Sequence, residues 1–280
     1  MPRLRLMGLV GALAVGPLAA SGAPAPVATL ESWRRSLFDR TAPEVVLVTD
    51  GTALGSAFAV APGCLVTSAH VVGRHRLVRV VSNGGEKLRA EVVQRGRHGS
   101  DVALLRVRGL KSRGLRVGDP RELHVGSWVG VVGHGAGAHW SFNTGMVSNI
   151  YHDDKGRSVI QTQIPLNPGS SGAPVLNSDG EVVGIVTAGI VRANAINFAV
   201  PIDLALTALP RLSSRWGPLV ILAPPGARVL LDGALVGVGR RVAAPTTPGR
   251  HRVEVVAGHR LRAVAVFYPH RRRVDLRAGR

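Results

Sequence analysis

The sequence predicts an all-β protein. Short runs rich in Val, Ile and Leu recur between Gly and Pro residues, which is the pattern of strands separated by turns. Apolar residues make up 45% of the 280 residues, enough for a sizeable core. Apolar stripes of helical period are rare, so alternating parallel strand and helix units are disfavoured. About a dozen short strands over roughly 160 residues indicate one or two antiparallel barrels.

Residues 1–25 have the layout of a secretory signal peptide. Arg3 and Arg5 precede an apolar run from Leu6 to Ala20, and small residues with proline follow. The run is short for a spanning helix, which needs about 20 residues, and Pro17 interrupts it. We therefore expect an exported protein of the periplasm or cell envelope. An uncleaved signal that anchors the chain in the inner membrane is the alternative.

The remaining elements follow in chain order within an expected main domain, residues 26–212. A short amphipathic helix is expected at Val27–Arg40 and a closing helix at Asp203–Leu212. The lone Cys64 forms no intramolecular disulfide and is expected to be a small buried apolar residue. The expected strands are Glu44–Val48, Ser56–Val60, Cys64–Thr67, Leu77–Val81, Arg89–Gln94, Val102–Val107, Trp128–Val132, Phe142–Ser148, Ser158–Ile164, Gly172–Leu176, Val182–Thr187 and Asn197–Val200.

Three places in this region carry chemistry. His70 stands among small residues where a strand runs into a turn, Asp101 precedes an apolar strand, and Ser171 lies in a turn rich in Gly. Taken singly, each has a structural explanation: a structural histidine, a strand-start aspartate and a β-turn serine. Together they supply a base, an orienting carboxylate and a hydroxyl, the parts that activate a serine nucleophile.

The motifs around these residues resemble those of trypsin-like serine proteases, and among these proteases they resemble the bacterial HtrA/Deg type most. The resemblance covers about Glu44 to Leu209 and is carried by four blocks in the family's order. These blocks are Gly55–Val60 with Gly63–Val72, Asp101–Val107, Asn167–Pro174 and Asn197–Pro201. The resemblance implies a double six-stranded antiparallel β-barrel with its site between the barrels. Ser170, Ala173 and Gln163 depart from the residues that this family often has there.

The resemblance also implies roles. Ser171 would be the nucleophile, His70 the general base and Asp101 the orienting carboxylate, with the N–H groups of Gly169 and Ser171 as the oxyanion hole. A substrate pocket is expected at Gln163, Ile185, Val186 and Thr187, with preference for a small or aliphatic residue. The expected activity is hydrolysis of protein or peptide substrates through an acyl-enzyme, needing no metal or cofactor. The alternative is an inactive protease-fold protein that serves as an envelope-binding scaffold.

A change in composition marks residues 213–218 as a linker and residues 219–280 as a second, small antiparallel β-domain. Its segments Pro225–Gly237 and Pro248–Gly258 resemble the PEGA domain of bacterial envelope proteins, where Deg-type enzymes usually carry PDZ domains. Twelve arginines against three acidic residues give this tail a net charge of +9, half of the chain's +18. The tail is expected to bind anionic envelope polymer or lipid; a solvated basic surface is the alternative. Nucleic acid is not expected as a partner of an exported chain.

Overall fold

The structure is a computed structural model that describes residues 25–97, 100–135, 140–152, 158–189, 196–213, 216–246, 249–269 and 271–277. The described chain divides between Ser36 and Leu37 into two units, and each is described by itself. The signal-peptide prediction lies almost wholly outside the described residues. Helix α1 (Ala25–Thr41) covers the helix expected at Val27–Arg40. No helix within the described ranges is long and apolar enough to cross a membrane.

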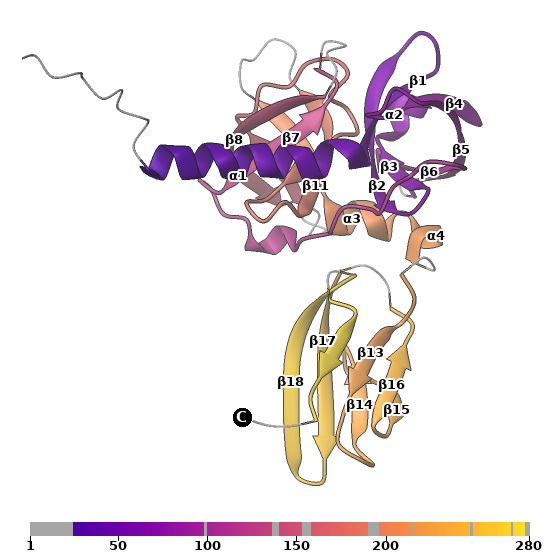
Figure 1. Cartoon of the computed structure of the whole chain (residues 1–280). Coiled ribbons are helices and arrows are strands. Elements are labelled where there is room, and N and C mark those ends of the chain that lie inside the picture. The colour runs from indigo at the N-terminus through magenta and orange to yellow at the C-terminus, as the bar shows by residue number, and fades with distance from the viewer. Residues whose placement is uncertain are drawn as a thin grey trace, which may run out of the picture. The chain divides into compact units, whose positions relative to one another are not determined.

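The first barrel is closed by six antiparallel strands in the order β1-β2-β3-β6-β5-β4 (Figure 1). Its core consists of small and branched apolar side chains such as Val46, Ala57, Leu65 and Leu105. Such side chains fill the interior of a small barrel without leaving a channel. Its strands are β1 (Val45–Thr49), β2 (Leu54–Ala61), β3 (Cys64–Thr67), β4 (Leu77–Val81), β5 (Lys87–Arg95) and β6 (Ala103–Val107), with the helical turns η1 (Ala42–Glu44) and α2 (Ala69–Val72).

The second barrel repeats this architecture in the order β10-β11-β12-β9-β8-β7. Val129, Val131, Ile160 and Val175 lie in its core. The two closed barrels confirm the fold class that the sequence predicted. The strands are β7 (Trp128–Gly133), β8 (Ser141–His152), β9 (Ser158–Thr162), β10 (Pro174–Leu176), β11 (Val182–Gly189) and β12 (Asn197–Pro201), preceded by the helical turn η2 (Pro120–Glu122).

Two elements differ from the sequence prediction for local reasons. The strand expected from Gly172 begins at Pro174, because Ala173 donates its N–H to Ser170 O and thus still belongs to the turn. The expected closing helix is two short helices, α3 (Ile202–Thr207) and α4 (Pro210–Ser213). Pro210 has no N–H to donate and disfavours helical backbone at the residue before it, so the first helix cannot continue through it.

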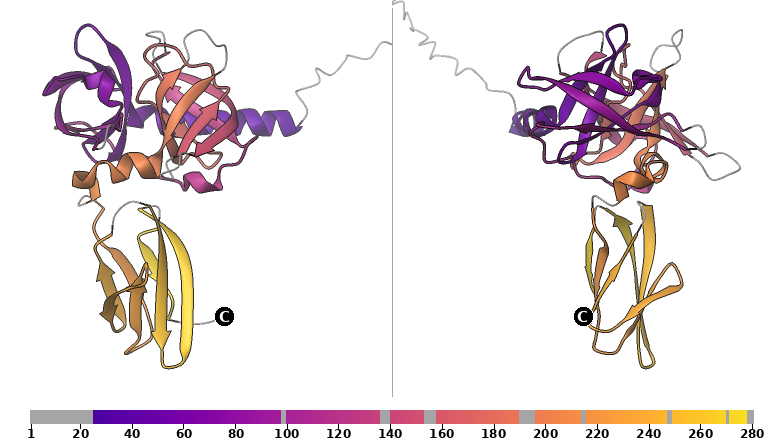
Figure 2. Two further views of the ribbon diagram at one scale, coloured as in Figure 1. Left: turned by 180° about the vertical axis from the view of Figure 1, so that it is seen from behind. Right: turned by 90° about the vertical axis from the view of Figure 1, so that its right-hand side faces the viewer.

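The C-terminal region is a further small β-domain of two sheets, seen as two layers in the right-hand view of Figure 2. Leu219, Val229, Val242 and Val253 lie in one core that both sheets share. Asp232 and Gly233 have φ of 51° and 82° and form a two-residue hairpin loop, as Asp-Gly pairs do. Pairing is antiparallel except between β13 and β19, which run parallel. One sheet holds β16 (Arg241–Ala244), β13 (Leu219–Leu222) and β19 (Arg273–Asp275); the other holds β15 (Ala234–Val238), β14 (Arg228–Leu231), β17 (Gly249–Ala257) and β18 (Arg260–Tyr268).

Candidate active site

The pairing of β3 with β6 brings His70 next to Asp101. Thr67, the last residue of β3, lies opposite Ala103, the first residue of β6. His70 follows β3 in the single helical turn α2, and Asp101 comes two residues before β6. The His70 ring Nδ1 lies 2.7 Å from Asp101 Oδ2, and the His70 backbone N–H donates to Asp101 Oδ1 at 2.9 Å. Both carboxylate oxygens thus fix the same histidine.

The two groups shift each other's pKa in opposite directions. The hydrogen bond to Asp101 raises the pKa of His70 above 6.5, although partial burial opposes this. Burial alone would raise the pKa of Asp101. The hydrogen bonds from His70, from Thr187 and from the His70 backbone outweigh burial, so the pKa of Asp101 is lowered. Asp101 is therefore ionised at neutral pH and holds the imidazole by its Nδ1 edge.

The Ser171 turn adopts a backbone that requires glycine at two positions. Gly169 and Gly172 have φ of 99° and 84°. A Cβ on Gly172 would lie 2.2 Å from Ser56 O, so no larger residue fits there. Gly169 and Ser171 do not donate their N–H groups to any acceptor in the described part of the chain. Two donors in one tight turn, both available, suit an anionic oxygen.

Thr187 joins the Ser171 turn to the His70–Asp101 pair. Its hydroxyl donates to Asp101 Oδ2 at 2.6 Å, and its backbone carbonyl accepts from Ser171 Oγ at 3.4 Å. The pair comes from the first barrel, whereas Thr187 on β11 and Ser171 come from the second. The structure therefore brings His70, Asp101 and Ser171 into one cluster between the barrels, with Ser171 Oγ hydrogen-bonded to Thr187 rather than to His70.

The four residues expected to form a substrate pocket are placed differently from one another. The Ile185 side chain is fully buried, and Val186 is 3% exposed and belongs to the core of the second barrel. Gln163 is exposed, and Thr187 is partly buried. Ile185 and Val186 thus present no free surface to a ligand in this structure. Contact of any of the four with a substrate stays a prediction.

Cys64 is buried and free, as expected for a small apolar residue in a strand. Throughout the described ranges, His, Cys, Asp and Glu form no group of three or more that could hold a metal ion.

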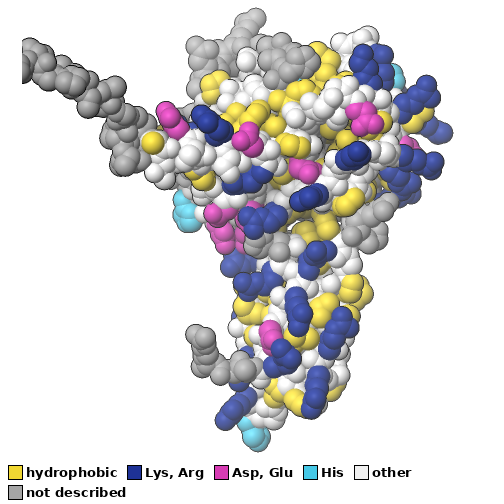
Figure 3. Space-filling model, viewed as in Figure 1, with side chains coloured by type: hydrophobic (Ala, Val, Ile, Leu, Met, Phe, Trp, Pro, Cys, Tyr) yellow, Lys and Arg dark blue, Asp and Glu magenta, His cyan; other side chains and the backbone are white. Residues whose placement is uncertain are grey.

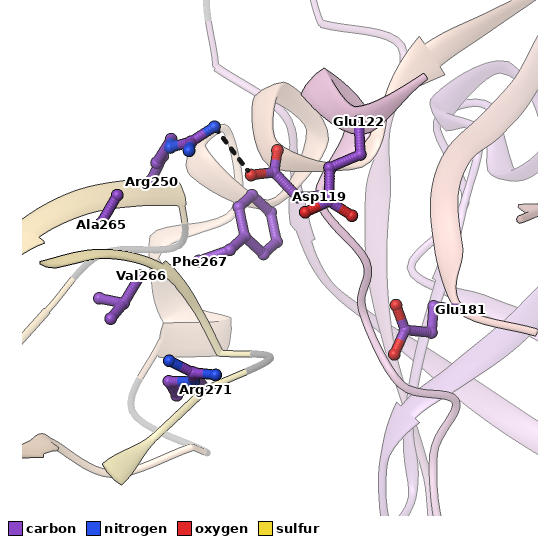
Figure 4. A pocket seen from close by; sticks show the side chains of 8 residues that line it. All are labelled: Asp119, Glu122, Glu181, Arg250, Ala265, Val266, Phe267 and Arg271. Atoms are coloured by element: carbon purple, nitrogen blue, oxygen red, sulfur yellow. Dashed lines mark hydrogen bonds and ion pairs between the residues drawn. The ribbon is translucent and has the colours of Figure 1, made fainter. Parts of the chain in front are cut away.

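A polar pocket is lined by residues of β17 and β18, of η2 and of the segment before β11 (Figure 4). Asp119 and Glu181 have nearly buried side chains there. Arg250 Nη1 lies 3.4 Å from Asp119 Oδ2, the ion pair drawn in Figure 4. Arg116 Nη2 lies 3.6 Å from Glu181 Oε1. These acidic groups are therefore compensated by arginines of the chain itself.

Comparison with known proteins gives results of two kinds, for sequence and for fold. Residues 55–185 match the family model described as "Trypsin-like peptidase domain". Proteins named "Probable periplasmic serine endoprotease DegP-like" from Halomonas elongata and Ectopseudomonas mendocina are 36% and 34% identical over 190 and 197 residues. Each alignment covers 64% of this chain but only 40% of the relative, so the chain spans well under half of their length.

Two solved structures share the fold. An inactive form of Rv3671c from M. tuberculosis is 24% identical with a TM-score of 0.58, covering 70% of this chain and 96% of that chain. The serine endoprotease from Yersinia pestis is 21% identical with a TM-score of 0.57, covering 84% of this chain and 96% of that chain. At these identities the likeness concerns the fold alone, and it agrees with the double barrel described above.

Proposed function

We propose that this chain is an exported serine endopeptidase of the HtrA/Deg type. The matched peptidase domain and the DegP-like relatives support this class of enzyme. The observation that carries the proposal is the His70–Asp101 pair, joined through Thr187 to a serine in a glycine-bracketed turn. Processing of envelope proteins or their quality control is the proposed setting, since the relatives are named periplasmic.

In the proposed mechanism, His70 removes the proton of Ser171 Oγ as the hydroxyl attacks the scissile carbonyl. Asp101 holds Nδ1, which leaves Nε2 to take that proton, and stabilises the imidazolium that forms. The tetrahedral oxyanion accepts hydrogen bonds from the N–H groups of Gly169 and Ser171. His70 then returns the proton to the leaving amine. A water molecule hydrolyses the acyl-enzyme by the same steps.

The test uses the protein without its first ~25 residues, the length of an ordinary secretory leader. It measures the hydrolysis of casein by this protein and the labelling of the protein by a fluorophosphonate probe. The matched variant is Ser171→Ala, and Ser170→Ala in the same turn controls for disturbance of the loop. Labelling and cleavage are expected for the wild type and for Ser170→Ala, and not for Ser171→Ala. A folded wild type without labelling would refute the proposal and favour the inactive scaffold.

The proposed signal peptide and the proposed PEGA-like character of the tail complete this assignment. Export predicts that the mature protein in the periplasmic fraction starts after the apolar run that ends at Ala20. N-terminal sequencing of that protein decides between cleavage and an anchor. An intact Met1 in the membrane fraction would support the anchor.

We further propose that the tail binds anionic envelope polymer or lipid. Arg228, Arg240, Arg241 and Arg260 are exposed, and none of the ion pairs among the described residues includes them. Lys and Arg side chains are dispersed over the face seen in Figure 3 rather than gathered in one patch. A dispersed basic surface suits an extended anionic partner better than a single small anion.

Replacing these four arginines with glutamine tests the tail proposal. The intact protein is expected to co-sediment with phosphatidylglycerol vesicles or with peptidoglycan at low salt, and the variant to bind less. Variant binding equal to the wild type, or no wild-type binding to either material, would contradict it.

A further inference from the structure

Ser56 of β2 is fully buried and holds the Ser171 turn at two carbonyl groups. Its N–H donates to Ser171 O at 2.8 Å, and its hydroxyl donates to Gly169 O at 2.9 Å. Ser170, between these two carbonyls, donates its N–H to Asn167 O at 2.9 Å. The peptide groups that surround the two proposed oxyanion donors are therefore fixed, and the Ser56 hydroxyl supplies one of the restraints.

The Ser56 hydroxyl has a single hydrogen, and this limits what its other neighbour can be. That hydrogen is directed at Gly169 O, so other groups in contact with Oγ must be donors. His134 provides two contacts: its backbone N–H at 3.1 Å and its ring Nδ1 at 3.1 Å. The ring contact is attractive only when Nδ1 carries a hydrogen. With the proton on Nε2 alone, Nδ1 would compete with Gly169 O for the hydroxyl hydrogen.

The His134 ring is held in place by its neighbours. His134 follows β7 and is 1% exposed, and its ring packs edge-on against Trp140 with centroids 4.6 Å apart. Trp140 in turn donates its indole N–H to Val45 O of the first barrel at 2.9 Å. Gly133 allows the close approach, because a Cβ there would lie 3.1 Å from Ser56 Oγ. The contact from His134 to Ser56 thus links the second barrel to the first.

We propose that His134 is a positioning residue for the oxyanion hole and acts through the hydroxyl of Ser56. A hydrogen on Nδ1 keeps the Ser56 hydroxyl directed at Gly169 O, and this bond keeps the N–H groups of Gly169 and Ser171 aimed at one point. The inference rests on the proposed function for its kinetic consequence. The geometric consequence, a restrained turn, does not depend on activity.

The kinetic test compares Ser56→Ala, His134→Phe and His134→Asn with the wild type on one peptide substrate. Removing an oxyanion donor itself costs about 10²–10³ in kcat. Loss of a restraint on that donor should cost less, about tenfold, with KM little changed. Phenylalanine keeps the ring but cannot donate, whereas an asparagine amide can donate to Ser56 Oγ. His134→Asn should therefore retain more activity than His134→Phe.

The double variant Ser56→Ala/His134→Phe tests the route. If His134 acts through Ser56, the double variant is no slower than Ser56→Ala alone. Additive losses in kcat would overturn the proposal. Thr162→Val is the control, because it removes another fully buried hydroxyl, one that donates to Met146 O away from the turn. A kcat loss in this control as large as that in Ser56→Ala would also overturn it.

Hydrogen exchange of the segment Asn167–Pro174 provides the readout that does not need activity. The N–H groups of Ser170 and Gly172 are hydrogen-bonded within this turn or to β11. Ser56→Ala and His134→Phe should speed exchange there, and Thr162→Val should not. Unchanged exchange in both variants would refute the restraint. A wild type that is not labelled by fluorophosphonate, but whose variants exchange faster, would refute the proposed function and leave the restraint established.

Discussion

Replacing Thr187 with valine should lower kcat/KM about tenfold. Thr187 Oγ1 donates to Asp101 Oδ2 at 2.6 Å, a short distance typical of a hydroxyl bound to an ionised carboxylate. Hydrogen bonds to charged groups contribute about 1.5–3 kcal/mol. The Asp101 side chain is 30% exposed and keeps two donors from His70, so the lower end, about 1.5 kcal/mol, applies. We assign this difference to the transition state, in which Asp101 faces the imidazolium of His70. Since 1.36 kcal/mol is a factor of ten, the change is about tenfold.

The assay is steady-state hydrolysis of a chromogenic peptide from pH 5 to 9, beside Thr187→Ser as the matched control. Serine keeps the hydroxyl and should retain most of kcat/KM, whereas valine keeps the shape without the hydroxyl. The reasoning is refuted if Thr187→Val has wild-type kcat/KM throughout, or if Thr187→Ser loses as much. An effect on KM and cleavage preference alone would assign Thr187 to the substrate pocket instead.

Three further predictions concern His70, Gly172 and Asp232. The acid limb of kcat/KM should have an apparent pKa above 6.5, because His70 must be neutral to act as a base. Asp101→Asn should lower that pKa and reduce kcat about 10⁴-fold. A pH profile of this variant equal to that of the wild type would contradict the prediction. Gly172→Ala should lower the free energy of unfolding in urea by more than ~2 kcal/mol and abolish fluorophosphonate labelling. The reason is that Gly172 has a φ of 84° and that a Cβ there has no room. A free energy of unfolding and a labelling yield near those of the wild type would exclude this steric argument. Burial raises the pKa of Asp232, but hydrogen bonds, first that from His251, outweigh burial and lower this pKa overall. Ionised Asp232 therefore stabilises the fold above its unfolded pKa of about 3.9, and this stabilisation is lost as the pH falls below that value. Thermal unfolding of Asp232→Asn should accordingly depend less on pH in that range than thermal unfolding of the wild type.

Most of the elements could be predicted, and the three central residues of the candidate site could be proposed, because their signals are local. Apolar runs between turn residues mark strands, and an Asp-Gly pair such as Asp232–Gly233 marks a hairpin loop whatever surrounds it. His70, Asp101 and Ser171 each lie in a short motif. Their proximity in space was implied by the resemblance and not by spacing, because barrel closure decides which strand ends meet.

The contacts that support the site could not be predicted in this way. Thr187 lies 86 residues from Asp101, and Ser56 lies 78 residues from His134. A hydroxyl in an apolar strand has no local pattern that names its partner. Thr187 was accordingly expected to contact substrate, and Ser56 was only part of a family block. Alternation along β11 could not separate a pocket-facing side chain from a core one at Ile185 and Val186 either, because every residue from Val182 to Val186 is buried.

Each barrel is continuous in the sequence, and this gives the proposed enzyme an order of assembly. The first barrel ends at Val107, so it can close while the strands of the second are still being synthesised or exported. A chain made only up to that point carries His70 and Asp101 but lacks Ser171 and the two proposed oxyanion donors. A partly made chain therefore holds a base without a nucleophile. The proposed proteolytic activity would therefore require the strands of both barrels.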